Sequence, residues 1–299
     1  MVFMSYRHAD AYTKLRRGQR VNIAIIGDSI GYGTGASSEE SKWTVQLQQY
    51  LSETYGAQVN LDNYSLGGNT SYAGYVSVKK LTGGRTYDLA ILCYGANDDE
   101  DDFGLYYESI IQALYDHNPG VQMIAIKENP LDVHNPKMEK LQELCDYYAI
   151  PVVDMIAPFA EKGYDELVVD SVHPNDAGYA IYFAEVRNCI DKQVAEHRKN
   201  KKEQVAVEER VSAFDRYENA KSLSEIDHGG VLGIHYLLKE GQSIAVYKDG
   251  ELLVDIGYAG FAQEYYKVID EDFHPGDNIK IVVEVGEPEA IIMDYGVSW

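Results

Sequence analysis

Apolar segments alternate with helical patterns over the first two-thirds of the chain, and this alternation restricts the fold more than any other feature. Four of the five segments are almost continuously apolar, which indicates strands that are buried on both faces, as in a parallel sheet. The predicted strands are Val21–Gly27, Ala57–Leu66, Tyr87–Gly95, Val121–Glu128 and Ile150–Ile156. The predicted helices are Trp43–Thr54, Tyr72–Leu81, Leu105–His117, Pro136–Tyr148 and Asp176–His197. We therefore expect right-handed crossovers and an α/β fold, a three-layer α/β/α sandwich.

The character of the sequence changes near residue 200. Residues 191–210 are highly charged and lack apolar periodicity, which is typical of a helix end that runs into a linker; one long solvated helix is the alternative. Short β-type segments follow, and Asp249-Gly250 between two alternating runs is a strong hairpin signal. We predict a first domain over residues 1–200 and a small antiparallel β-sandwich over residues 208–299.

The net charge excludes two classes of partner. The chain has 48 acidic and 26 basic residues, a formal net charge of −22. Such a surface repels nucleic acid and anionic membranes, because both bind clustered Lys and Arg. We therefore expect no nucleic acid and no membrane as partner. The simplest role of the acidity is solubility.

Cysteine content and the N-terminal sequence bear on the compartment. Cys93, Cys145 and Cys189 lie far apart in apolar or amphipathic segments, without the paired spacing of a zinc site, so buried free thiols are expected. The first twenty residues contain no apolar core of a signal peptide, and no run of 18 apolar residues occurs. As written, the sequence predicts a cytoplasmic protein; secretion stays open if a leader has been removed.

Polar residues gather directly after the predicted strands, where parallel α/β sheets form their sites. The segments are "GDSI", "SLGGNT", "GAND" and, after the fifth strand, "DSVHPN". They supply Ser29 as a nucleophile, His173 as its base and Asp170 to hold the other ring nitrogen of the histidine. The backbone amides of Ser29 and Gly68 and the side-chain amide of Asn97 would stabilise an oxyanion. This is the inventory of an acyl-transfer enzyme.

In this order, the four segments resemble the signature blocks of the SGNH (GDSL-type) hydrolase family. The resemblance covers residues 20–195 and says nothing about the C-terminal region. It implies a flavodoxin-like fold with a five-stranded parallel sheet, a serine nucleophile, a histidine on the same loop as its aspartate, and a three-donor oxyanion hole with no metal or cofactor. Gly68 matches the oxyanion glycine of the family better than Gly67, because a small polar residue and a threonine follow it.

Two neighbouring residues support this arrangement. Pro174 disfavours helical geometry at His173 and suits the start of the following helix, so the histidine is expected on a rigid turn. Asp28 is expected to fix the first turn through side-chain hydrogen bonds to the backbone, and not to belong to the triad.

Three other segments could form a functional site, but the sequence supports each of them less well. The segment "NDDEDD", residues 97–102, lacks the ligand spacing of a calcium loop, so a solvated acidic loop is the favoured interpretation. His134 is a rival base whose one nearby carboxylate, Asp132, has the sequence context of a helix cap. The glycines after the first strand do not have the dinucleotide-binding spacing, and the P-loop lysine is absent.

The sequence favours hydrolysis of short-chain esters, most simply O-acetyl groups on carbohydrate, through an acyl-enzyme. No long apolar insertion near the site would cover a fatty chain, and tyrosines near the site loops suit stacking on sugar faces. The alternatives left open are an O-acetyltransferase, a lysophospholipase or thioesterase, and a glycan-binding module with an inactive hydrolase domain. The expected ligand is a small-molecule or oligosaccharide ester, and a homo-oligomer also stays open.

Overall fold

The first part of the chain contains the expected parallel sheet, with strand order β2-β1-β3-β4-β5. The computed structural model describes residues 9–81, 85–131, 134–196, 217–260, 262–285 and 293–298. The strands are β1 (Val21–Gly27), β2 (Val59–Asn63), β3 (Leu89–Cys93), β4 (Gln122–Lys127) and β5 (Val152–Asp154). Strand β5 is shorter than predicted, because the Asp154 carboxylate accepts the Ile156 amide at 2.8 Å and so begins a helix.

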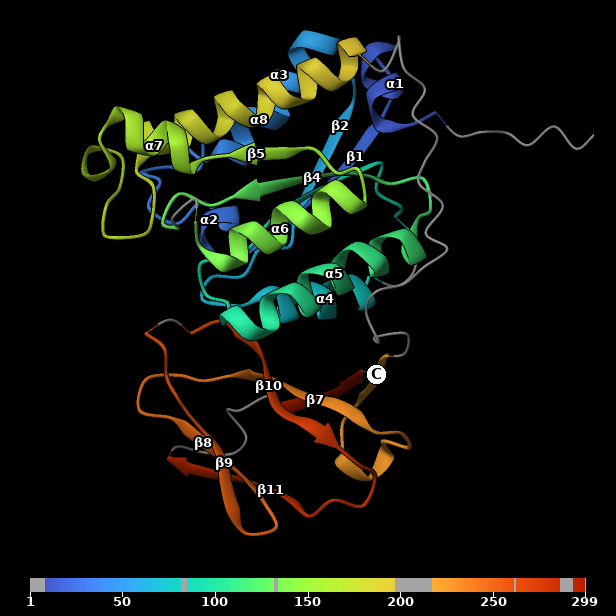
Figure 1. Ribbon diagram of the computed structural model, residues 1–299, viewed down its shortest axis with the longest axis vertical. Coiled ribbons are helices and arrows are strands. Elements are labelled where there is room, and N and C mark those ends of the chain that lie inside the picture. Colours follow the sequence, from blue (N-terminus) through green and yellow to red (C-terminus); the bar gives the residue numbers. More distant parts are fainter. Residues whose placement is uncertain are drawn as a thin grey trace, which may run out of the picture.

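Helices cover both faces of the sheet, which confirms the three-layer α/β/α sandwich (Figure 1). The helices are α1 (Ala11–Arg16), α2 (Ser29–Tyr32), α3 (Trp43–Tyr55), α4 (Ser71–Lys79), α5 (Glu100–His117), α6 (Pro136–Tyr147), α7 (Ile156–Lys162) and α8 (Asp176–Glu196), with a 3₁₀ turn η1 at Tyr164–Glu166. Helices α4, α5 and α6 form a core with one face, and α1, α3 and α8 with the other. The short helices α1, α2 and α7 were not predicted.

Helix α5 corrects one expectation. It begins at Glu100, five residues before the predicted start, and Glu100, Asp101 and Asp102 occupy its first turn. Acidic side chains are stabilised there by the positive end of the helix dipole. The interpretation of "NDDEDD" as a solvated acidic loop was therefore wrong for its second half, which is helical.

The C-terminal part forms two antiparallel sheets that enclose a separate core. One sheet has the order β10-β7-β12-β6 and the other β11-β8-β9. The strands are β6 (Tyr217–Ala220), β7 (Gly230–Leu237), β8 (Ser243–Lys248), β9 (Glu251–Gly257), β10 (Glu264–Phe273), β11 (Ile279–Val285) and β12 (Met293–Ser298), with a 3₁₀ turn η2 at Leu223–Glu225. Asp249 and Gly250 both have positive φ, 54° and 89°, which confirms the predicted hairpin between β8 and β9. The proposed domain boundary, residues 200–208, lies outside the described residues.

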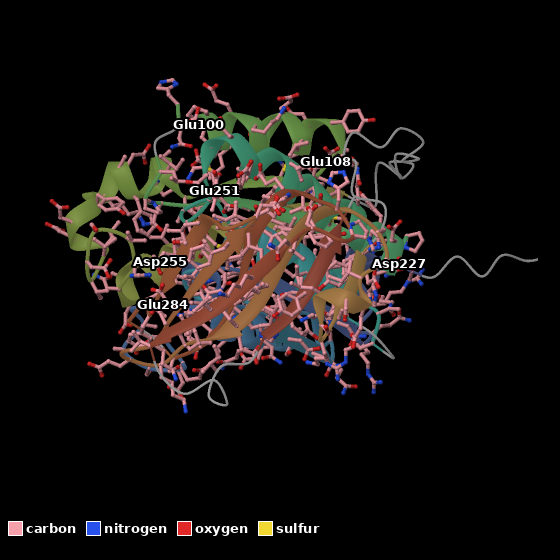
Figure 2. All side chains as sticks on the ribbon, turned by 90° about the horizontal axis from the view of Figure 1, so that it is seen from below. Glu100, Glu108, Asp227, Glu251, Asp255 and Glu284 are labelled. Carbon is pink, nitrogen blue, oxygen red and sulfur yellow. The ribbon has the colours of Figure 1, made fainter. Side chains whose placement is uncertain are left out.

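Charged groups cover the outer sheet of this domain. Figure 2, seen from below, shows Glu251 and Asp255 on β9 and Glu284 on β11, and all three are exposed. The thiols of Cys93 and Cys145 are free and buried as expected, whereas Cys189 is only half-buried. None of the described helices is both long and apolar enough to cross a membrane.

The β-domain packs beneath helices α4 and α5 (Figure 1) and contacts α4 through strand β10. Gly233 in β7 allows this close approach, because a Cβ atom there would lie 2.0 Å from the hydroxyl oxygen of Tyr72 in α4. The Lys80 ammonium lies 4.8 Å from the ring centre of Tyr266 in β10. The second domain is therefore held against helix α4, which follows the loop after β2.

Candidate active site

The turn that contains Ser29, the predicted nucleophile, joins β1 to α2. Gly27 ends the strand where no side chain fits, because a Cβ atom there would lie 2.7 Å from the carbonyl oxygen of Cys93. Asp28 then caps α2, its Oδ1 accepting the Ile30 amide at 2.9 Å. This confirms the predicted role of Asp28 in fixing the turn. Ser29 follows as the first helical residue, 7% exposed.

The structure brings Ser29, His173 and Asp170 into one hydrogen-bonded chain. Ser29 Oγ lies 2.9 Å from His173 Nε2, although 144 residues separate the two in sequence. His173 Nδ1 lies 2.8 Å from Asp170 Oδ2. With the Nδ1 proton donated to the carboxylate, Nε2 has a free lone pair that accepts the serine proton. The geometry therefore meets the requirement for activating a serine hydroxyl.

The loop that holds His173 is rigid. Asp170 Oδ1 accepts the backbone amides of Val172 and His173, both at 2.7 Å. The Val169 amide donates to the His173 carbonyl at 2.9 Å, and Pro174 forms a β-bridge with Val168. Burial would raise the pKa of Asp170, but the hydrogen bonds from the imidazole and the two amides outweigh it and lower the pKa to about 2.

The candidate oxyanion donors border the same serine. Gly68 lies in the turn after β2 with a φ of 67°, which favours glycine. Gly67 lies beside Ser29, because a Cβ atom built on Gly67 would be 3.5 Å from Ser29 Cβ. The Asn97 amide nitrogen donates to the Asn69 carbonyl at 3.1 Å and to Asp28 Oδ2 at 3.2 Å. The three loops therefore converge, while the choice of the Gly68 amide stays a prediction.

Residues that sequence reasoning missed hold the Asn97 loop. Glu128, at the end of β4, accepts the Ala96 amide at 2.8 Å. Lys137 in α6 donates to the Gly95 and Asp98 carbonyls at 2.6 and 2.7 Å. Glu128 stands at the carboxyl end of a strand, so the rule that identified the other loops could have found it as well.

The β-domain also reaches the site, which the sequence did not indicate. The Gln263 side-chain amide donates to the Gly67 carbonyl. Asn69, only 2% exposed, pairs with strand β10: its amide nitrogen donates to the Glu264 carbonyl at 3.2 Å and its oxygen accepts the Tyr266 amide at 2.9 Å. The Tyr265 ring lies 3.2 Å from where a Cβ atom on Gly68 would be. One edge of the C-terminal domain therefore borders the loop that contains Gly68.

Two other candidate sites lie apart from this arrangement. Among the described residues, Glu218, Asp227 and His228 are close enough together to hold a metal ion, and none of them belongs to the loops around Ser29. The histidine that contacts Ser29 is His173 and not His134. Asp132, the expected cap beside His134, lies outside the described residues, and Asn135 caps helix α6.

The fold and the site are typical of serine hydrolases with a three-layer α/β/α fold, in which the serine follows the first strand of a parallel sheet. A family model for the GDSL-like lipase/acylhydrolase family matches residues 25–181. The chain belongs to this family and is a carboxylic ester hydrolase.

The solved structures extend the similarity of fold to both domains. A two-domain esterase described as active on acetylated mannans is 16% identical, with a TM-score of 0.75 over 95% of this chain and 93% of its own. Its structure co-crystallised with mannopentaose gives 17% identity and a TM-score of 0.71 over 96% and 94% of the two chains. At this identity the similarity establishes the fold. No curated protein matches the chain.

Proposed function

We propose that this protein removes short acyl groups, principally acetyl, from carbohydrate esters through a Ser29–His173–Asp170 triad and an acyl-enzyme. The observation that carries the proposal is the unbroken chain from Ser29 Oγ to His173 Nε2, 2.9 Å, and from His173 Nδ1 to Asp170 Oδ2, 2.8 Å. A serine hydroxyl is a weak nucleophile unless a positioned base takes its proton, and His173 lies where such a base is needed.

In the first half of the reaction, Ser29 Oγ attacks the ester carbonyl carbon while its proton moves to His173 Nε2. The imidazolium that forms is stabilised by Asp170, whose lowered pKa keeps it ionised. When the tetrahedral intermediate collapses, the proton passes from Nε2 to the departing alcohol oxygen. In the second half, a water oxygen attacks the acyl carbon while His173 Nε2 takes its proton. When this tetrahedral intermediate collapses, the bond to Ser29 Oγ breaks, Nε2 returns the proton to Oγ, and the carboxylic acid leaves.

The oxyanion of each tetrahedral intermediate needs donors that are already in place. The Ser29 and Gly68 amides and the Asn97 side chain are assigned this task. In the free protein, Asn97 donates to Asp28 and Asn69, so one of its N–H groups has to turn toward the oxyanion when substrate binds.

Three features support carbohydrate as the alcohol part of the ester. The structures that match over both domains belong to an esterase whose description names acetylated mannans. Gln263, whose amide reaches the Gly67 carbonyl beside the nucleophile, is a group that hydrogen-bonds sugar hydroxyls well. Tyr265 places an amphipathic ring next to Gly68, where it suits contact with a sugar face. We therefore propose that the β-domain forms one wall of the substrate site.

Acetate release from p-nitrophenyl acetate and from a panel of acetylated manno- and xylo-oligosaccharides tests the proposal. Replacing Ser29 by Ala should lower kcat by about 10⁴–10⁶-fold, because the nucleophile is lost. Ser38→Ala is the matched control, since Ser38 is exposed and hydrogen-bonds to Ser41. Equal rates for wild type and Ser29→Ala would overturn the triad. Activity on the aryl ester without acetate release from any oligosaccharide would overturn the carbohydrate substrate alone.

A further inference from the structure

Two carboxyl groups meet beneath the proposed oxyanion hole. Asp28 leaves strand β1 and Glu128 leaves β4, and both side chains are fully buried. The two carboxyl groups hydrogen-bond to each other. A hydrogen bond between two carboxyl groups needs a proton on one of them, and two neighbouring buried carboxylates cannot both be ionised at moderate cost. The pair therefore holds at least one proton.

Each of the two carboxyl groups accepts one backbone amide and one further donor. Glu128 accepts the Ala96 amide at 2.8 Å and the Cys93 thiol at 3.2 Å. Asp28 accepts the Ile30 amide at 2.9 Å through one oxygen and the Asn97 side-chain amide at 3.2 Å through the other. Burial and the neighbouring Glu128 raise the pKa of Asp28 well above its usual range, whereas burial raises the pKa of Glu128 only to about 7. The negative charge is thus best placed on Glu128 and the proton on Asp28.

Resting on the proposed function, we propose that Glu128 and Asp28 are positioning residues: Glu128 holds a proton on Asp28, so that Asn97 faces a neutral acid and can turn an N–H toward the oxyanion. The reason is electrostatic. An ionised Asp28 would hold the Asn97 amide by a charge-assisted hydrogen bond, which is about twice as strong as a neutral one. Its charge would also oppose the oxyanion in a site of low dielectric.

Other ionisable groups surround the pair. Those that interact with it electrostatically are Cys93, Tyr94, Asp98, Tyr107, Tyr179 and Tyr182. Burial raises the pKa of the thiol and of the four phenols, so these groups stay neutral at the pH of the reaction. Asp98 is the one other acid, with its pKa raised to about 6 by burial, and it accepts both the amide and the hydroxyl of Ser71. Because Asp98 loses its proton near pH 6, a change of charge beside Asn97 at alkaline pH comes from the pair.

Substitutions that remove the charge of Asp28 or Glu128 but keep the size of the side chain test this proposal. Asn at position 28 still accepts the Ile30 amide as a helix cap and offers N–H groups to Glu128, but it no longer accepts from Asn97. Gln at position 128 donates to Asp28 and so stabilises its ionised form. Glu139→Gln, at an exposed position in the first turn of α6, is the matched control.

The experiment measures kcat and KM for p-nitrophenyl acetate from pH 5 to 9 in wild type, Asp28→Asn, Glu128→Gln and the double variant. Glu128→Gln should lower kcat by about 10–100-fold with KM within about threefold, because Asp28 then ionises beside an oxyanion donor. Asp28→Asn should stay within about tenfold of wild type, and the double variant should return to within about threefold of Asp28→Asn, because no charge remains.

Independent effects, in which the loss of the double variant is the product of the single losses, would overturn the inference and leave the esterase intact. If Glu128→Gln does not fold, Asp28→Asn decides by itself. Wild-type kcat should fall on the alkaline side as the pair loses its proton, and Asp28→Asn should abolish that fall; an unchanged profile would overturn the inference. Wild-type activity no higher than that of Ser29→Ala would instead overturn the proposed function, and this inference with it.

Discussion

Asp170 and Asp28 are two aspartates near Ser29, and their surroundings shift their pKa values in opposite directions. Asp170 has a half-exposed side chain and accepts three hydrogen bonds, one from the imidazole and two from amides, so its pKa falls to about 2. Asp28 is fully buried next to Glu128, so its pKa rises well above the usual range. Carboxyl groups with pKa values pushed apart take different tasks in a reaction. In the proposed reaction, Asp170 carries the charge that stabilises the histidine, and Asp28 stays neutral beside the oxyanion donor Asn97.

The largest effect is expected for a substitution of Asp170, the ionised aspartate of the two. Asp170→Asn should lower kcat by about 10³–10⁴-fold, because the amide no longer stabilises the imidazolium and favours the wrong tautomer of His173. Steady-state kinetics on p-nitrophenyl acetate would measure this loss. Asp165→Asn, an exposed aspartate in the nearby η1 turn, is the matched control. A loss of less than tenfold would mean that Asp170 does not serve the histidine, and the contrast between the two aspartates would lose its catalytic meaning.

The second-largest effect is expected for Asn97, the side chain that hydrogen-bonds to Asp28, the neutral aspartate. Asn97→Ala should lower kcat by about 10²–10³-fold, as removal of one oxyanion donor does. KM should change much less, because the interaction forms in the transition state. The measurement is kcat and KM for one aryl ester, with the exposed Asn188→Ala in α8 as control for a lost side-chain amide. A loss confined to KM would assign Asn97 to substrate binding.

The sequence sufficed for the parts of the site that lie at strand ends with short local motifs. Ser29, Asp170, His173 and Asn97 were all named from such segments, and the structure brings them together. The start of α5 was misplaced because acidic residues are typical of both loops and helix N-termini, and the dipole that favours them is visible only once the helix exists.

Long-range packing set the limit of the prediction. Glu128 was missed because its partners come from the ends of two other strands, β1 and β3, and its own segment carries no motif. Gln263 was missed because it meets Gly67 across 196 residues and between two domains. Neither contact follows from periodicity or from spacing along the chain, since each depends on how whole elements dock.

A smaller effect is expected for Gln263, which lies at the edge of the site and not among its reacting groups. Gln263→Ala should raise KM for an acetylated oligosaccharide by about 2–10-fold, the value of one neutral hydrogen bond, with kcat for p-nitrophenyl acetate unchanged. Gln49→Ala, the same substitution at an exposed position in α3, is the control. An equal loss on both substrates would show that Gln263 supports the Gly67–Gly68 turn and not the sugar.

The last difference between the two aspartates is one of stability. Asp170 has a folded-state pKa below its unfolded value of about 3.9, so its stabilising effect is present above about pH 4 and is lost as the pH falls toward about 2. Asp28 has the opposite effect on stability: its folded state keeps a proton that the unfolded chain releases above about pH 4, so stability falls as the pH rises.

Asp28→Asn should therefore raise Tm more at pH 8 than at pH 5, by about 2–4 °C for each kcal/mol gained. Asp170→Asn should leave the difference in Tm between pH 5 and pH 8 unchanged. Calorimetry of both variants at the two pH values makes the comparison, and a Tm gain for Asp28→Asn that is the same at pH 5 and pH 8 would mean that Asp28 is ionised in the folded protein.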